Sequence, residues 1–158
     1  MKNRFKYCLI ALFVLFQGFL FSLSGEVLVA RVVDGDTYIF VNASGNEIRC
    51  RMYGIDAPEM KQDFGKKSKE NLTKMIEKQT VRVELVDIDR YGRAIVKTYL
   101  NDADIGLVMI ESGSAWHYWQ YSKEKSKYQK AQKIAKSRSI GLWKNKKAVA
   151  PWEFRKKK

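Results

Sequence analysis

Three short motifs in the 158-residue chain combine carboxylates with arginines. Asp36 lies in an Asp-Gly-Asp-Thr turn, Arg51 precedes the segment from Asp56 to Glu59, and Arg93 ends an Asp-Arg-Tyr-Gly-Arg turn. Carboxylate oxygens are the ligands that calcium and magnesium prefer, and a planar guanidinium group matches phosphate oxygens bidentately. A bound cation, a general base and two arginines are the parts that a metal-assisted phosphodiesterase needs.

Each motif taken alone has a simpler interpretation. Residues 34–36 form a typical turn, Arg51 and Glu59 could be a surface ion pair, and residues 89–93 could be a plain hairpin turn. The chemical interpretation therefore depends on the three motifs occurring together.

The segments around these motifs predict five strands. Residues 26–33, 37–42 and 47–53 are short, rich in β-branched residues and separated by turn residues, which indicates a meander. Residues 80–87 alternate apolar with charged side chains, and a fifth strand over 93–100 follows the turn at residues 89–92.

Three helices complete the expected architecture. The spacing of apolar residues predicts a helix over 66–78, a second helix that Asp104 caps and Gly113 ends, and a third from Ser122 to about Arg138. The resulting order is β-β-β-α-β-β-α-α. Five strands with a helix between the third and the fourth indicate an α+β fold, mainly β, built on a five-stranded OB-fold barrel.

The two ends of the chain differ from this domain. Residues 1–24 have a basic start, an apolar stretch and small residues before Gly25, which is typical of a signal peptide. An uncleaved membrane anchor is the alternative, because the apolar stretch approaches the length that spans a bilayer. We expect one domain over 25–145 and a basic tail over 146–158, in which residues 151–154 pack back by their aromatic rings and residues 155–158 are frayed.

Composition narrows the choice of partners and chemistries. The net charge of +13 favours a polyanionic partner, which could be nucleic acid, anionic lipid or a cell-wall polymer. His117 is the only histidine, so chemistry that needs two histidines is excluded, as are zinc sites built on several His and Cys. Cys8 would be removed with the signal peptide, so Cys50 would have no partner for an internal disulfide. We interpret Cys50 as a structural residue of a strand.

The three motifs, in this order and in these strand contexts, resemble those of the staphylococcal nuclease (thermonuclease) family. The resemblance extends over roughly residues 26–143. It implies an exported calcium-dependent endonuclease that cuts the P–O5′ bonds of DNA and RNA, prefers single strands and leaves 3′-phosphate ends. It implies no stable protein partner, a monomer, and a membrane location only if the N-terminal segment is retained.

The resemblance also implies a role for each matching residue. Asp36 and Asp56 match the carboxylate ligands of Ca2+, and Ala57 matches the residue whose backbone carbonyl binds the ion. Arg51 and Arg93 match the pair that binds the phosphate. The catalytic set is completed by Glu59, which matches the carboxylate assigned to activate the attacking water.

Aromatic residues supply the expected substrate contacts. Tyr91, Trp119 and Tyr121 match family positions that flank or stack on the nucleotide, whereas we assign Trp116 and Tyr118 to the core. Stacking on aromatic rings tolerates any base. The alternative function is a non-catalytic OB-fold binder of nucleic acid or another polyanion, which uses the same basic charge and aromatic rings without cleavage.

Overall fold

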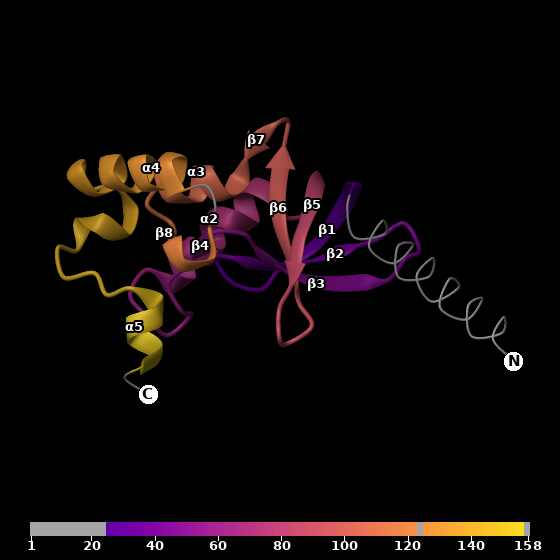
Figure 1. Cartoon of the computed structure of the whole chain (residues 1–158), viewed down its shortest axis with the longest axis horizontal. Coiled ribbons are helices and arrows are strands. Elements are labelled where there is room, and N and C mark those ends of the chain that lie inside the picture. The colour runs from indigo at the N-terminus through magenta and orange to yellow at the C-terminus, as the bar shows by residue number, and fades with distance from the viewer. Residues whose placement is uncertain (1–24, 123–124, 157–158) are drawn as a thin grey trace, which may run out of the picture.

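The core of the protein is a closed five-stranded barrel. The structure is a computed structural model that describes residues 25–122 and 125–156 (Figure 1). Successive antiparallel pairings give the sheet order β3-β2-β1-β5-β6, and a parallel pairing of β3 with β6 closes it. The strands are β1 (Gly25–Val32), β2 (Thr37–Val41), β3 (Glu47–Met52), β5 (Thr80–Ile88) and β6 (Ala94–Leu100). The expected OB-fold barrel is confirmed.

Alternation along the strands fills the barrel. Val27 and Val29 of β1 face inward while Leu28 between them is 47% exposed. Tyr38 and Phe40 of β2 are fully buried in the same core. Because side chains on a strand point to opposite faces in turn, Leu28 of β1 lies on the outer surface, whereas Ile39, between Tyr38 and Phe40 on β2, is buried from both sides.

The three expected helices are present. Helix α2 (Gly65–Ile76) packs on the barrel through Leu72 and Ile76, which are fully buried. Asp104 caps α3 (Ile105–Glu111) by accepting a hydrogen bond from the Leu107 backbone N–H at 3.1 Å. The third expected helix corresponds to α4 (Lys125–Ser137), which packs against α3.

Several shorter elements were not expected. They are β4 (Ile55–Asp56), β7 (Ala103–Asp104), β8 (Trp116–His117), the 3-10 helices η1 (Trp119–Tyr121) and η2 (Gly141–Lys144), and α5 (Pro151–Lys156). The most consequential is the antiparallel pair of β4 and β8, in which Asp56 lies opposite Trp116. This pair fixes the backbone of an acidic motif against an aromatic segment from much later in the chain.

The C-terminal helix α5 is anchored by stacked aromatic rings. The Trp152 ring stacks on Tyr118 with centroids 5.3 Å apart and contacts Trp116 edge-on at 5.7 Å, so this segment packs back by its aromatic rings as expected. We expected residues 155–158 to be frayed, and this is wrong for Arg155 and Lys156, which are helical. The aromatic contacts of the first turn of α5 hold the helix against the domain.

Residues 1–24, predicted as a signal peptide or anchor, lie outside the described residues. Within the part of the chain that the structure describes, no helix has both the length and the apolar character needed to cross a membrane.

Candidate active site

The acidic turn before β2 positions Asp36. The backbone N–H of Asp36 donates to the Asp34 side chain at 3.1 Å, and the backbone N–H of Met52 donates to the Asp36 carbonyl at 2.8 Å. The Asp36 side chain is 3% exposed and accepts hydrogen bonds from the Thr37 hydroxyl and from the Ala57 backbone N–H, each at 2.9 Å. The turn therefore fixes this carboxylate firmly in a buried position.

Arg51 connects the two buried aspartates. Its Nη1 donates to Asp36 Oδ1 at 3.0 Å, and its Nη2 donates to Asp56 Oδ1 at 2.6 Å. The residue is on β3 directly opposite Thr37 in the β2–β3 pairing, which explains its proximity to Asp36. The neighbouring carboxylates raise the pKa of Arg51 despite its burial. Asp36 and Asp56 consequently converge on one guanidinium group.

Burial disfavours the ionised form of the Asp36 carboxylate. The pKa of Asp36 is raised to about 6, because burial and the charge of Asp34 raise it by more than Arg51 and the hydrogen bonds from Ala57 and Thr37 lower it. A buried carboxylate with a raised pKa is one that a further nearby cation would stabilise in its ionised form.

Glu59 is placed by a tight turn at the start of α2. The Gln62 backbone N–H donates to the Glu59 carbonyl at 2.8 Å, and the Glu59 N–H donates to the Gln62 side chain at 3.1 Å. Gly65, the first residue of α2, lies against this turn. A Cβ at Gly65 would come within 2.0 Å of the Glu59 carbonyl oxygen.

Gly65→Ala is therefore expected to destabilise the protein. The added methyl group would meet backbone rather than a flexible side chain, and such overpacking costs about 1–3 kcal/mol. The free energy of unfolding from denaturant titration measures the effect. Lys66→Ala, at the exposed next residue of α2, is the matched control and should change the free energy of unfolding by less than about 0.5 kcal/mol. Equal stability of the two variants would contradict the close contact.

A third arginine joins the cluster from the C-terminal helix. Arg155 Nη2 donates to Asp56 Oδ2 at 2.7 Å, and Arg155 Nη1 donates to Glu59 Oε1 at 2.7 Å and to Asp56 Oδ1 at 3.2 Å. Sequence analysis missed this residue, because it placed residue 155 in a frayed tail. The aromatic residues of α5 were the only sequence feature that could have indicated it.

Arg93 shares a face of the sheet with Arg51, and within the described part of the chain its side chain pairs with Asp89 rather than with the cluster. Arg93 directly precedes β6, two residues before Ile95, which pairs with Arg51 in the parallel β3–β6 register, so Arg93 and Arg51 belong to the same face. The Arg93 Nε donates to Asp89 Oδ2 at 2.7 Å. Asp89 also accepts from the Tyr91 and Arg93 backbone N–H groups, and these bonds lower the pKa of Asp89 against the opposing effect of its burial.

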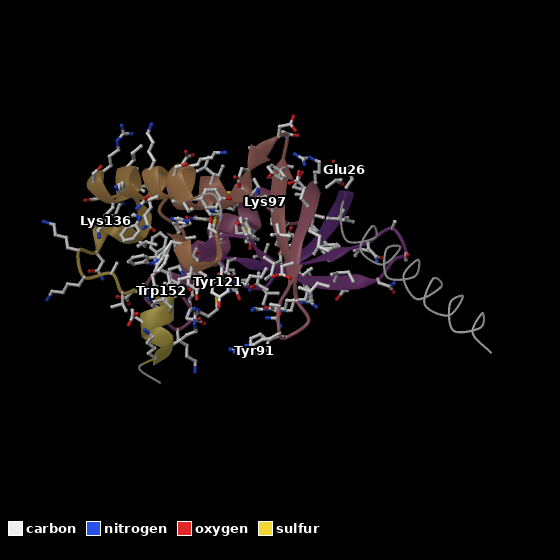
Figure 2. All side chains as sticks on the ribbon, viewed as in Figure 1. Glu26, Tyr91, Lys97, Tyr121, Lys136 and Trp152 are labelled. Carbon is white, nitrogen blue, oxygen red and sulfur yellow. The ribbon has the colours of Figure 1, made fainter. Side chains whose placement is uncertain are left out.

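The expected substrate-binding rings are all exposed. Tyr91 is 68% exposed at the β5–β6 turn, and Trp119 and Tyr121 are 57% and 67% exposed on η1. Figure 2 labels Tyr91 and Tyr121. Tyr118, which we had assigned to the core, is half-buried and stacks on Trp152. Burial and then the charge of Asp56 raise the pKa of its hydroxyl. Trp116 packs on Trp143 at 4.3 Å, in the second apolar cluster.

Two other reactive side chains are buried in the core. Cys50 has no exposed surface, and burial raises the pKa of its thiol to about 12. His117 is 4% exposed, and burial lowers the pKa of its imidazole. Neither side chain reaches solvent, so neither suits nucleophilic attack on a bulky substrate.

The cluster fits a divalent cation by charge and by donor type. Four carboxylates (Asp34, Asp36, Asp56, Glu59) face two guanidinium groups (Arg51, Arg155), which leaves two negative charges. Among the described residues, no three His, Cys, Asp or Glu side chains converge on a metal position. The carboxylates available to an ion here are those of Asp36 and Asp56, which converge on Arg51. Calcium accepts such a set, because waters complete its coordination.

Comparisons with known proteins show which family the chain resembles. The family model described as "Staphylococcal nuclease homologue" matches residues 49–145. A Haemophilus influenzae protein named "Uncharacterized endonuclease" is 36% identical over 128 residues, 81% of this chain and 71% of that protein. An Escherichia coli protein of the same name is 37% identical over 82% of this chain and 84% of its own length. The Arabidopsis thaliana "Staphylococcal-like nuclease CAN1" is 38% identical over 71% of this chain, which spans only 34% of that protein.

The barrel and its cluster of carboxylates and arginines define an OB-fold domain of nuclease type. The chain belongs to the staphylococcal nuclease family. The family match begins after Asp36 and ends before Arg155, so these two residues enter the site on the geometry described above.

Proposed function

We propose that the chain is a calcium-dependent endonuclease that hydrolyses phosphodiester bonds of DNA and RNA, prefers single strands and leaves 3′-phosphate ends. The observation that carries the proposal is the convergence of Asp36, Asp56 and Glu59 on Arg51 and Arg155 at one surface of the barrel. The endonuclease names of the bacterial relatives support the same activity.

Each residue of the cluster has a defined task in this proposal. Asp36, Asp56 and the carbonyl of Ala57 would hold Ca2+, which when bound supplies positive charge against that of the phosphodiester. Arg51 and Arg93 would hold the phosphate and stabilise the charge that develops on it. Glu59, which is 35% exposed and so accessible to water, would accept a proton from the attacking water.

The aromatic rings at the rim would explain a preference for single strands. Tyr91, Trp119 and Tyr121 are exposed, and unpaired bases can stack on such rings whatever their identity. The basic chain would attract the phosphate backbone, and this contribution to binding weakens as salt is added.

Removal of calcium tests the proposal directly. The mature protein is expected to degrade denatured DNA and RNA in calcium and to lose this activity in excess chelator, with recovery when calcium is restored. The products should gain 3′-hydroxyl ends only after phosphatase treatment. Equal degradation in calcium and in chelator would contradict the calcium site, and tight binding without cleavage would favour the non-catalytic binder.

We further propose that the protein is a monomer exported through residues 1–24, with retention as a membrane anchor as the alternative. The basic start, apolar stretch and small residues before Gly25 support export. Mass spectrometry of the exported protein distinguishes the two, because cleavage after Ser24 gives a chain that begins at Gly25.

A further inference from the structure

Arg155 connects the proposed base to a proposed calcium ligand. One guanidinium group donates to both oxygens of Asp56 and to Glu59 Oε1, with two of the three bonds at 2.7 Å. The two carboxylates raise the pKa of Arg155, although burial alone would lower it. Hydrogen bonds in which both partners are charged are stronger and more directional than neutral ones.

The position of Arg155 is built into the fold. Pro151 is buried at the start of α5, and Trp152 is held between Tyr118 and Trp116. The side-chain amide of Gln62, in the turn after Glu59, donates to the Val149 carbonyl just before α5. These contacts hold the start of α5 and the turn after Glu59 against each other and against the domain. The salt bridges of Arg155 are therefore not the only interactions that fix its position.

Arg155 leaves room for a cation. A carboxylate offers about four lone-pair positions, two on each oxygen. Within the described part of the chain, Asp36 Oδ2 accepts only the Ala57 N–H, and Asp56 Oδ2 accepts only Arg155 Nη2. One oxygen of each aspartate therefore keeps an unused acceptor position while all the arginine contacts persist.

We propose that Arg155 is a positioning residue, which holds the Glu59 carboxylate beside Asp56 for proton transfer and weakens the binding of calcium at the site. The second effect follows from its positive charge next to Asp56. The inference rests on the proposed nuclease function, and it assigns to α5, which lies beyond the family match, a direct part in that function.

Three variants separate this role from a purely structural one. Arg155→Ala removes both the contacts and the charge, and Arg155→Lys keeps the charge but cannot make the forked contacts to two carboxylates. Lys156→Ala is the matched control, because Lys156 is the next residue of α5 and pairs only with Glu153 among the described residues. Calcium affinity is measured by calorimetric titration without substrate, turnover on denatured DNA at saturating calcium, and folding by thermal unfolding.

The two readouts are expected to move in opposite directions. Arg155→Ala should lower kcat by roughly 10- to 100-fold with little change in KM, as for residues that orient a reacting group. The same variant should bind calcium about threefold to tenfold more tightly, because a nearby positive charge is lost. Arg155→Lys should restore the calcium affinity but only part of kcat, and Lys156→Ala should leave both within about twofold of the wild type.

Several results would overturn the inference. An Arg155→Ala variant with kcat within twofold of an active wild type would show that Glu59 needs no such support, and a raised kcat would show that Arg155 blocks the site instead. Weaker calcium binding would contradict the charge effect. If Arg155→Ala does not fold, Arg155→Lys decides, since wild-type kcat in that variant also refutes the positioning role. An inactive wild type would refute the proposed function itself, a result distinct from all of these.

Discussion

Arg51→Lys is expected to lower kcat/KM on denatured DNA by roughly 100- to 1000-fold, the usual cost of removing one group that stabilises transition-state charge. Arg51 uses separate nitrogens for Asp36 and for Asp56, at 3.0 and 2.6 Å. A lysine ammonium is a single point of charge and cannot span both carboxylates with this geometry or bind phosphate as a fork. Arg51→Lys keeps the positive charge, so a loss of kcat/KM would result from the lost geometry of the guanidinium group.

Arg49→Lys is the matched control for this prediction. Arg49 lies on the same strand and the same face of β3, two residues earlier, and is exposed. It should retain kcat/KM within about twofold, as surface substitutions usually have small effects. Arg49→Lys should unfold within a few degrees of the wild type. Arg51→Lys should unfold at a lower temperature, because a buried carboxylate loses its partner, so steady-state kinetics at saturating calcium is compared at a temperature where both variants are folded. A loss of less than tenfold in Arg51→Lys would show that charge alone suffices at this position.

The barrel was predictable because its strands carry a strong periodic pattern. Alternation of buried valines with exposed residues in β1, and of apolar with charged residues in β5, is a property of the local sequence. The β4–β8 pair was not predictable in this way. Two residues are too few to show a period, and the pairing joins Ile55 and Asp56 to residues at least sixty positions away.

The residues of the site could be predicted where they are close in the sequence, and not where they come from distant parts of the chain. Asp36 directly precedes β2, and Arg51 lies on β3, which a short turn joins to β2, so the motifs indicated that they would meet. Arg155 reaches Glu59 from 96 residues further along the chain, and a terminal basic residue has no pattern that reveals its partner. Tyr118 was assigned to the core because an aromatic cluster in the sequence does not show which of its rings will be only half-buried.

The motif that ends at Arg93 can be recognised in the sequence, but the sequence does not show how the Arg93 side chain is held. The sequence motif ends at Arg93, but it does not say that Asp89 would hold the side chain through Nε at 2.7 Å. Gly92 adopts a φ of +74°, which favours glycine, and lets the turn bring the two backbone N–H groups onto Asp89. A motif residue, Asp89, can thus act by orienting an arginine that we propose binds the phosphate.

Glu59→Gln is expected to reduce kcat by roughly 100- to 10,000-fold, the contribution usual for a general base. The amide oxygen of glutamine can still accept a hydrogen bond from Arg155, which lies 2.7 Å from Glu59 Oε1, so the side chain should keep its place. It cannot accept a proton from water near neutral pH. KM should change little, because the two arginines that we propose hold the phosphate are untouched.

Glu153→Gln provides the control for Glu59→Gln. Glu153 lies on α5 and pairs with Lys156 at 3.0 Å, so the substitution removes the same charge from an acid–base pair outside the cluster. Single-turnover cleavage of a short labelled strand at saturating calcium isolates the chemical step from product release. A Glu59→Gln rate within tenfold of the wild type would mean that water is activated without this carboxylate. Glu59 and Arg155 would then serve the fold of the site rather than proton transfer, so this single substitution tests the residue on which the role of the C-terminal helix depends.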